Sequence, residues 1–223
     1  MIVDAHNHLH LLEGTDLHGY GIDQCVTCGT SPSDWDLVLE LAQADAAVVP
    51  AIGLHPWFVD RAPPSWLDQL GEKLLSNPRA CVGEIGLDRT RRSPALPEQR
   101  AVLAAQLDLA ADLDRPAVLH CVRAFGSLLE ALGDRHLPQR GIMLHGWAGA
   151  AELIPRFLEL PVPVYFSVSS ADQLELIPEG RLLVESDASP DNGRTPAFVS
   201  DFIAENRIDA KRIARNYRAL FGE

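Results

Sequence analysis

Short apolar segments alternate with longer amphipathic segments along the 223 residues of the chain. The apolar segments are rich in Val, Ile and Leu, and such short runs are typical of parallel strands that are buried on both faces. We expect strands at residues 2–5, 25–28, 47–54, 80–85, 117–120, 141–145, 164–167 and 182–185. Because each parallel strand needs a long crossover connection to the next, this alternation limits the fold more than any other feature of the sequence.

Helical patterns fill most of the intervals between the predicted strands. Ser33 is a favourable N-cap for the first helix, and Pro64 and Pro97 begin two others, because proline suits the first helical turn. We expect helices at residues 33–44, 64–75, 97–113, 125–132, 150–158, 171–177, 196–206 and 210–221. The link between the first two strands is short and polar and shows no clear helical pattern.

This arrangement predicts an α/β protein with a TIM-type (β/α)8 barrel in a single domain, residues 1–223. An open doubly wound sheet is the main alternative, because it is built from the same strand and helix units. The sequence has no internal repeat, low-complexity segment or linker that would divide the chain. The net charge of −12 argues against non-specific binding to polyanions, although bound metal ions would supply local positive charge for a nucleic-acid substrate.

The four cysteines favour a reducing compartment. Cys25 and Cys28 have CxxC spacing but lie in a predicted buried strand, without a second CxxC pair or a nearby His pair. We expect free thiols, with a redox or metal role for this pair as the alternative. The N-terminal residues show no signal-peptide pattern, and no apolar run approaches the roughly 18 residues of a membrane span. We therefore expect a cytoplasmic protein without membrane contact.

Histidine or carboxylate side chains stand at the ends of five predicted strands. These residues are His6 and His8, Glu84, His120, His145 and Asp187. In a barrel of parallel strands the carboxyl ends meet on one face, and active sites lie there. We therefore expect all six side chains to converge.

The His6-Asn7-His8 segment predicts a metal site, because residues two apart on a strand point to the same side. Imidazoles and carboxylates together suit Zn, Mn, Fe or Ni, and Mg is a further candidate. Six donors exceed the need of one open catalytic ion, whereas two divalent metal ions that share a bridging carboxylate use them all. Such pairs, with ions about 3.5–4 Å apart, are common in phosphoester hydrolysis.

The alternative is that these histidines are ordinary hydrogen-bonded residues, as a single strand-end histidine usually is. Five of the eight histidines, however, close apolar strand-like runs: His6, His8, His55, His120 and His145. The other three, His10, His18 and His136, lie in polar stretches, and we expect them at the surface. This biased placement favours the metal interpretation.

Taken together, these segments resemble the TatD family of metal-dependent hydrolases, which are TIM-barrel nucleases. The similar segments are VDAHNHL (3–9), GLHP (53–56), GEIGLD (83–88), Gln99 through Ala110, RPAVLH (115–120) with Arg123, LHGWAG (144–149), ESDASP (185–190), and Asn216 to Phe221. They run in family order from end to end of the chain. The resemblance implies a metal-dependent hydrolase that cleaves DNA phosphodiester bonds with a water activated by two metals.

The family pattern also implies roles for individual residues. One ion would be held by His6, His8, Glu84 and Asp187, and the second by Glu84, His120 and His145. Glu84 would bridge the ions, in place of the carboxylated lysine of many related amidohydrolases. Asp187 would orient the attacking water or take its proton, so Glu84 and Asp187 are the predicted catalytic residues.

Further residues are candidates for substrate contacts. His55 could contact phosphate or tune a ligand, and Arg123 could bind an anionic group; a structural hydrogen bond and a surface charge are the respective alternatives. Asp4 and Asp88 are expected to act behind the ligands or structurally. Trp147 could stack on a base, although core packing is the favoured interpretation.

Three loops depart from the family pattern, at residues 89–92, 146–148 and 188–193. Arg89, Arg91 and Arg92 in the first loop could meet a phosphate backbone or lie in a solvated turn. A small-molecule amide, lactone or phosphoester hydrolase is therefore the alternative enzyme, and a metal-binding scaffold without turnover is the alternative from another class. The native metal, exonuclease or endonuclease action and the oligomeric state stay open, and the sequence is compatible with a monomer.

Overall fold

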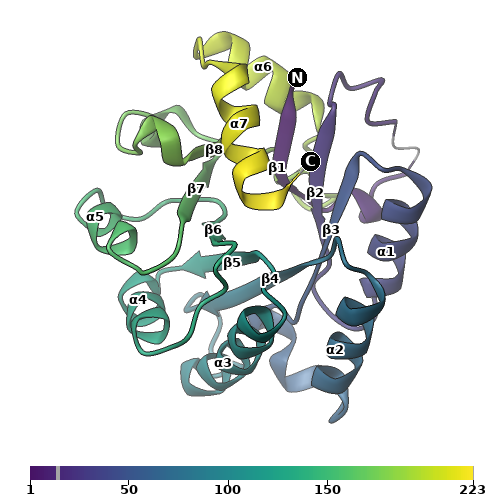
Figure 1. Ribbon diagram of the computed structural model, residues 1–223, viewed down its shortest axis with the longest axis vertical. Helices are drawn as coiled ribbons and strands as arrows, with labels where there is room; N and C mark the ends of the chain where they lie inside the picture. Colours follow the sequence, from purple (N-terminus) through teal and green to yellow (C-terminus); the bar gives the residue numbers. More distant parts are fainter. Residues whose placement is uncertain (14–15, 223) are drawn as a thin grey trace.

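A computed structural model describes residues 1–13 and 16–222, and in it eight parallel strands form one sheet in the order β1-β2-β3-β4-β5-β6-β7-β8. The strands are β1 (Val3–Asn7), β2 (Gln24–Cys28), β3 (Val48–Ile52), β4 (Cys81–Asp88), β5 (Ala117–Val122), β6 (Ile142–Leu144), β7 (Val164–Val168) and β8 (Leu182–Val184). Helices surround the strands on the outside (Figure 1). The predicted strands are all present, with shifts of a few residues at their ends.

Backbone hydrogen bonds join the first strand to the segment that follows the last one. The amide of Asp187 donates to the carbonyl of His6 at 2.9 Å, and the amide of His8 donates to the carbonyl of Ala188 at 2.9 Å. These bonds close the sheet into the predicted TIM-type barrel, so the open doubly wound sheet is excluded. Three of the predicted metal ligands, His6, His8 and Asp187, take part in these bonds through their backbones.

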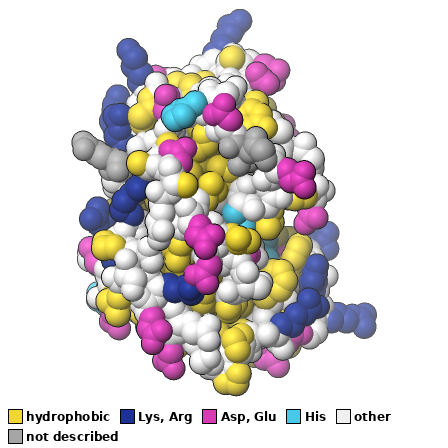
Figure 2. All heavy atoms as spheres, turned by 90° about the vertical axis from the view of Figure 1, so that its right-hand side faces the viewer, with side chains coloured by type: hydrophobic (Ala, Val, Ile, Leu, Met, Phe, Trp, Pro, Cys, Tyr) yellow, Lys and Arg dark blue, Asp and Glu magenta, His cyan; other side chains and the backbone are white. Residues whose placement is uncertain are grey.

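The α-helices are α1 (Trp35–Ala44), α2 (Trp66–Ser76), α3 (Leu96–Asp112), α4 (Phe125–Gly133), α5 (Leu153–Leu158), α6 (Ala197–Glu205) and α7 (Ala210–Phe221). Large apolar side chains from helices and strands are fully buried between the two layers, among them Trp35, Phe157, Phe166 and Tyr217. Burial of this apolar surface is the main stabilising contribution to the barrel. The face in Figure 2 carries acidic and basic side chains at several separate places, as expected for solvated helix surfaces.

Two predicted helices differ from the structure. The helix expected at residues 171–177 is replaced by a short 3-10 helix, Ala171–Gln173, which buries none of its residues and is followed closely by Pro178. Leu174 and Ile177 of this segment pack against the core without a regular helix, and proline would interrupt the continuation of one. The helix expected at residues 150–158 begins three residues later, at Leu153, after a turn.

The predicted N-cap of the first helix is also different. Asp34, not Ser33, precedes α1, and its carboxylate makes no capping bond to that helix. Instead it accepts hydrogen bonds from the amides of Thr30 and Ser31. The carboxylate therefore stabilises the loop between β2 and α1.

Further predictions concern the chain as a whole. The single domain predicted for residues 1–223 includes residues 14, 15 and 223, which lie outside the described residues, and it stays a prediction. Cysteines 25, 28, 81 and 121 are free and buried, as expected for plain thiols. Within residues 1–13 and 16–222, no helix is long and apolar enough to cross a membrane. The cytoplasmic location stays a prediction.

Candidate metal centre

The six predicted metal ligands lie together at the carboxyl end of the barrel. His6 lies within β1, Glu84 within β4 and His120 within β5, whereas His8, His145 and Asp187 follow β1, β6 and β8. Residues at this end of parallel strands share one face of the barrel. The predicted convergence of side chains from five strands is therefore present.

One oxygen of Glu84 faces the two histidines of the first strand. Its Oε2 lies 3.5 Å from Nε2 of His8 and 3.6 Å from Nε2 of His6. Oδ1 of Asp187 lies 3.6 Å and 3.7 Å from Nε2 of His6 and of His8, respectively. These four side chains enclose one small space, and Glu84 is only 3% exposed.

The other oxygen of Glu84 faces a second group of histidines. Its Oε1 lies 2.7 Å from Nδ1 of His120, 2.8 Å from Nε2 of His145 and 3.4 Å from Nε2 of His55. The carboxylate thus stands between two sets of imidazoles, one at each oxygen. The Oε1 contacts to His120 and His145 have the length of direct hydrogen bonds, and the whole cluster is consistent with a metal site.

The donor atoms fit metal ions in spacing and in chemistry. Two ligands bound about 2.1 Å from a tetrahedral ion lie roughly 3.4 Å apart, close to the 3.5–3.7 Å separations in the first group. Both ring nitrogens of His6 are buried without a hydrogen-bond partner, which is costly unless another group binds there. Three sets of potential ligands have donor atoms within 4.8 Å of one another: His6 with His8 and Asp187, His6 with Glu84 and His145, and His55 with Glu84 and His120. The clusters are therefore consistent with metal binding.

Hydrogen bonds behind the imidazoles fix their orientation. Nδ1 of His8 lies 2.8 Å from the carbonyl oxygen of Cys28, so this nitrogen donates and leaves Nε2 free as a ligand. Nε2 of His120 lies 3.1 Å from Oδ2 of Asp88, which also accepts a hydrogen bond from Nε1 of Trp57 at 2.7 Å. Partners of this kind orient metal-binding histidines and raise their basicity. Asp88 thus lies behind His120, which agrees with either of its expected roles.

Glu185 is a contact of the site that the sequence analysis missed. Its side chain is fully buried, its Oε1 lies 3.4 Å from Nδ1 of His145, and the same oxygen accepts a hydrogen bond from the amide of Gly146 at 2.7 Å. The available signal was spacing, because Glu185 and Asp187 are two residues apart, as are His6 and His8.

Asp4 has a structural role in closing the barrel. Its carboxylate accepts hydrogen bonds from the amide of Ser186 at 2.9 Å, from the hydroxyl of Ser186 at 2.6 Å and from Nδ2 of Asn7 at 3.0 Å. Complete burial raises the pKa of Asp4 to about 7, despite these bonds. The contacts hold β1 against the segment after β8.

Glu84 and the imidazoles around it shift one another's pKa values. Burial alone would raise the pKa of Glu84, but the neighbouring His145 and His55 hold it well below its usual range. Burial would lower the pKa of His145, yet Glu84 and Glu185 raise it well above its usual value. Burial lowers the pKa of His6 and keeps this imidazole neutral, which is the form that binds metal.

A cavity of about 340 Å³ opens above these residues. Its lining includes the predicted substrate contact His55 and, in addition, Thr30, Trp57, Phe58 and Asp191. The guanidinium of Arg91 stacks 3.9 Å above the Trp57 ring, so the basic loop reaches the rim of the cavity. Arg123 is exposed just after β5 and is not among the lining residues, so its substrate contact stays a prediction.

Two other predictions for single residues have clear outcomes. Trp147 is 3% exposed and packs edge-to-face against Phe125, Phe157 and Phe166, so it belongs to the core and cannot stack on a base. The prediction of a surface position is wrong for His10, whose side chain is 1% exposed and lies 3.7 Å from Asp34.

His10 is buried because it lies in a short 3-10 helix, Leu9–Leu11, that turns its ring toward α1. The other two histidines expected at the surface, His18 and His136, are exposed.

Known proteins share this barrel over almost its whole length. Residues 3–215 match the family model described as TatD related DNase. The chain is 32% identical over 178 residues to the uncharacterized metal-dependent hydrolase YjjV of Escherichia coli (strain K12), and this match covers 75% of this chain and 68% of YjjV. It is 30% identical over 237 residues to the 3'-5' ssDNA/RNA exonuclease TatD of Enterobacter lignolyticus (strain SCF1), a match that covers 91% and 88% of the two chains. The crystal structure of YjjV, a TatD homologue, has a TM-score of 0.86 and 26% identity, and the match covers 100% of this chain and 98% of that one.

Proposed function

This chain belongs to the TatD family of metal-dependent hydrolases, and from that premise we propose that it cleaves phosphodiester bonds in DNA. The observation that carries the proposal is the position of Glu84, whose two oxygens face different imidazoles, Oε2 those of His6 and His8 and Oε1 those of His120 and His145. A pair of cations at such a carboxylate suits phosphoester hydrolysis. The printed name of one relative, a 3'-5' ssDNA/RNA exonuclease, agrees with this reaction class.

The proposed ligand assignment follows the two sides of Glu84. On one side, His6, His8 and Asp187 would hold the first ion together with Oε2. On the other side, His120 and His145 would hold the second ion together with Oε1. Zn, Mn, Mg, Fe and Ni are all candidates for this donor set.

Asp187 is the proposed general base. Divalent cations held at this centre would supply positive charge against the phosphate oxygens and lower the pKa of a water molecule. Asp187 lines the cavity with its side chain 37% exposed, so it can take the proton from the attacking water. As the new P–O bond forms and the ester P–O bond breaks, Asp187 returns the proton to the leaving oxygen.

The remaining substrate contacts are proposed from the cavity wall. His55 lines the cavity and would contact a phosphate oxygen. Arg91, stacked on Trp57 at the rim, would meet the next phosphate of a nucleic-acid backbone. Arg123, exposed on the loop after β5, would contact a more distant part of the substrate.

A small-molecule amide, lactone or phosphoester hydrolase is the second candidate. Asp191, from a loop that departs from the family pattern, lines the cavity and adds a carboxylate where a polyanionic strand would pass. A second carboxylate beside Asp187 favours a smaller or less charged substrate.

Labelled single-stranded DNA, incubated with Mg or Mn, tests the proposal. We expect cleavage by the wild type and by the control variant Glu152→Ala, whose side chain is exposed and does not line the cavity. Glu84→Ala should lose at least about 1000-fold in rate, because it removes the shared ligand. Equal rates for Glu84→Ala and wild type would identify a contaminating nuclease. Turnover of a lactone or amide without DNA cleavage would support the second candidate instead.

A further inference from the structure

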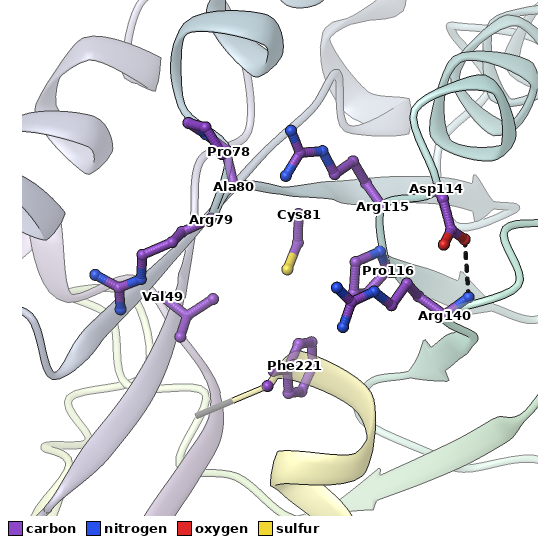
Figure 3. A pocket seen from close by; sticks show the side chains of 11 residues that line it. Val49, Pro78, Arg79, Ala80, Cys81, Asp114, Arg115, Pro116, Arg140 and Phe221 are labelled. Carbon is purple, nitrogen blue, oxygen red and sulfur yellow. Dashed lines mark hydrogen bonds between the residues drawn. The ribbon is translucent and has the colours of Figure 1, made fainter.

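A second cavity, of about 190 Å³, lies at the amino end of the barrel, opposite the metal centre. It opens between the beginnings of β3, β4 and β5 and the end of α7, and Figure 3 shows it from close by. Cys81, the first residue of β4, lies at its centre. The nucleic-acid cleavage proposed above does not use this cavity.

Three arginines line the cavity, and each lies at the same place relative to a strand. Arg79, Arg115 and Arg140 stand two residues before the first residues of β4, β5 and β6. Because these three strands are neighbours in the sheet, the arginines gather on one edge of the barrel. Figure 3 shows them around Cys81, with Phe221 on the remaining side.

These arginines have no carboxylate partner in residues 1–13 and 16–222, because none of the ion pairs found there includes them. The acidic residue of the lining, Asp114, accepts a hydrogen bond from the backbone amide of Arg140 at 3.0 Å. Arg79 donates to the carbonyls of Ala46 and Val48. The cavity therefore keeps most of its positive charge, in a chain whose net charge is −12.

The side chain of Arg115 gives the most specific indication that the cavity binds a ligand. Its Nε atom is buried and has no hydrogen-bond partner, and its Nη2 reaches the carbonyl of Leu74 only at 3.5 Å. A buried guanidinium donor without a partner is unfavourable, and an anion would satisfy it once the Arg115 side chain turns from Leu74 toward the cavity. Arg140, which is exposed at the rim, could then bind the same anion from the outside.

The three arginines act electrostatically on Cys81, at the centre of the cavity. Burial raises the pKa of the Cys81 thiol to about 12, while Arg115, Arg140 and Arg79 each act in the opposite direction. All three charges are therefore close enough to Cys81 to act on it. The protonated thiol cannot neutralise them.

We propose that this cavity binds a small phosphate monoester, with the phosphate held by Arg115 and Arg140 and the organic part packed against Phe221. Guanidinium groups match tetrahedral oxyanions with paired hydrogen bonds, and a phosphate dianion neutralises more of the three charges than a carboxylate does. The apolar part of the wall, Val49, Pro116 and Phe221, suits a ligand that carries an apolar or ring-shaped group.

Calorimetric titration of the metal-loaded full chain with phenyl phosphate, glycerol phosphate and inorganic phosphate tests the proposal. We expect one binding event per chain that Glu84→Ala retains, with phenyl phosphate the tightest ligand. Arg140→Ala, at an exposed position, should weaken this event at least about tenfold, and Arg115→Ala at least as much. The control Arg156→Ala, an exposed arginine of α5, should change nothing.

Two kinds of result would overturn the proposal. One is the absence of binding in the millimolar range, or binding that Glu84→Ala abolishes and Arg140→Ala leaves intact, because the phosphate would then bind at the metal centre. The other concerns Glu223, which follows Gly222 of the cavity lining in the sequence. If a variant without Glu223 binds phenyl phosphate and the wild type does not, Glu223 itself is the occupant.

Discussion

The two ends of the barrel carry opposite chemistry on the same three strands. At the carboxyl end, β4, β5 and β6 present Glu84, His120 and His145, which are part of the proposed metal centre. At the amino end, the same strands are preceded by Arg79, Arg115 and Arg140, which form a cavity that attracts anions. Each of these three strands thus contributes to two sites whose proposed ligands have opposite charge.

The strands themselves separate the two sites. Arg115 and His120 are five residues apart (120 − 115 = 5), which is roughly 16 Å along an extended strand. Between them lie Val118 and Leu119, both fully buried in the apolar core. Substitutions separated by more than about 7–10 Å usually act independently. The comparison therefore predicts that each end can be altered without changing the other.

Removal of metal should have the largest effect and should affect only the carboxyl end. After chelation we expect turnover to fall by at least about 1000-fold, because the cations supply several kcal/mol of transition-state stabilisation. Calorimetry on the same sample should still detect phenyl phosphate at the arginine cavity. Undiminished turnover after chelation would show that the reaction does not depend on bound metal ions.

Asp187→Asn should reduce kcat by about 100- to 10,000-fold, the range for loss of a general base. Asparagine keeps the shape of the side chain but cannot accept the proton. The pH–rate profile separates this role from simple metal binding, since the variant should lose the acidic limb of the wild-type profile. An unchanged profile, with metal content reduced, would make Asp187 a ligand only.

Glu185→Gln should have a smaller effect, a loss of about 10- to 100-fold in metal affinity or activity, as for other partners of metal-binding histidines. The glutamine side chain has the same shape, so the amide of Gly146 keeps an acceptor, and the lost feature is the negative charge beside Nδ1 of His145. Metal titration followed by activity at saturating metal distinguishes the two losses. Wild-type affinity in this variant would show that Glu185 does not position His145.

Arg140→Ala should have the smallest effect, with unchanged turnover and a free energy of unfolding that stays constant or rises by up to about 0.5 kcal/mol. The reason is that the substitution removes one of three neighbouring positive charges without breaking a side-chain ion pair. Denaturant unfolding in phosphate-free buffer measures this change, and adding phenyl phosphate should stabilise the wild type more than the variant. A clear loss of stability would mean that Arg140 holds the fold together.

The cluster of histidines and carboxylates at the carboxyl end of the barrel could be predicted from the sequence. The arginine cavity at the amino end was not predicted. The alternation of apolar and amphipathic segments marks where strands end, and His6, Glu84 and His120 have a chemistry that stands out there. The arginines could have been found by the same spacing argument applied to strand beginnings. Arginine before a strand is, however, common as a solvated charge, and only the structure shows that these three share a cavity without carboxylate partners among the described residues.

Other differences depend on packing that local sequence does not reveal. His10 lies in a polar stretch, but the 3-10 helix after β1 turns it against Asp34. The predicted helix at residues 171–177 is replaced by a short 3-10 helix and a turn, although Leu174 and Ile177 of the segment pack against the core. Glu185 contacts His145 across two elements that lie 40 residues apart in the chain (185 − 145 = 40).

The most direct test of the account is the number of metal ions bound per chain. After loading with Mn or Zn and removal of free metal, elemental analysis should give two ions per chain for the wild type and for Glu152→Ala, and at most one for Glu84→Ala. Fewer than one ion per wild-type chain would contradict the central claim that Glu84 joins two cation sites at the carboxyl end of the barrel.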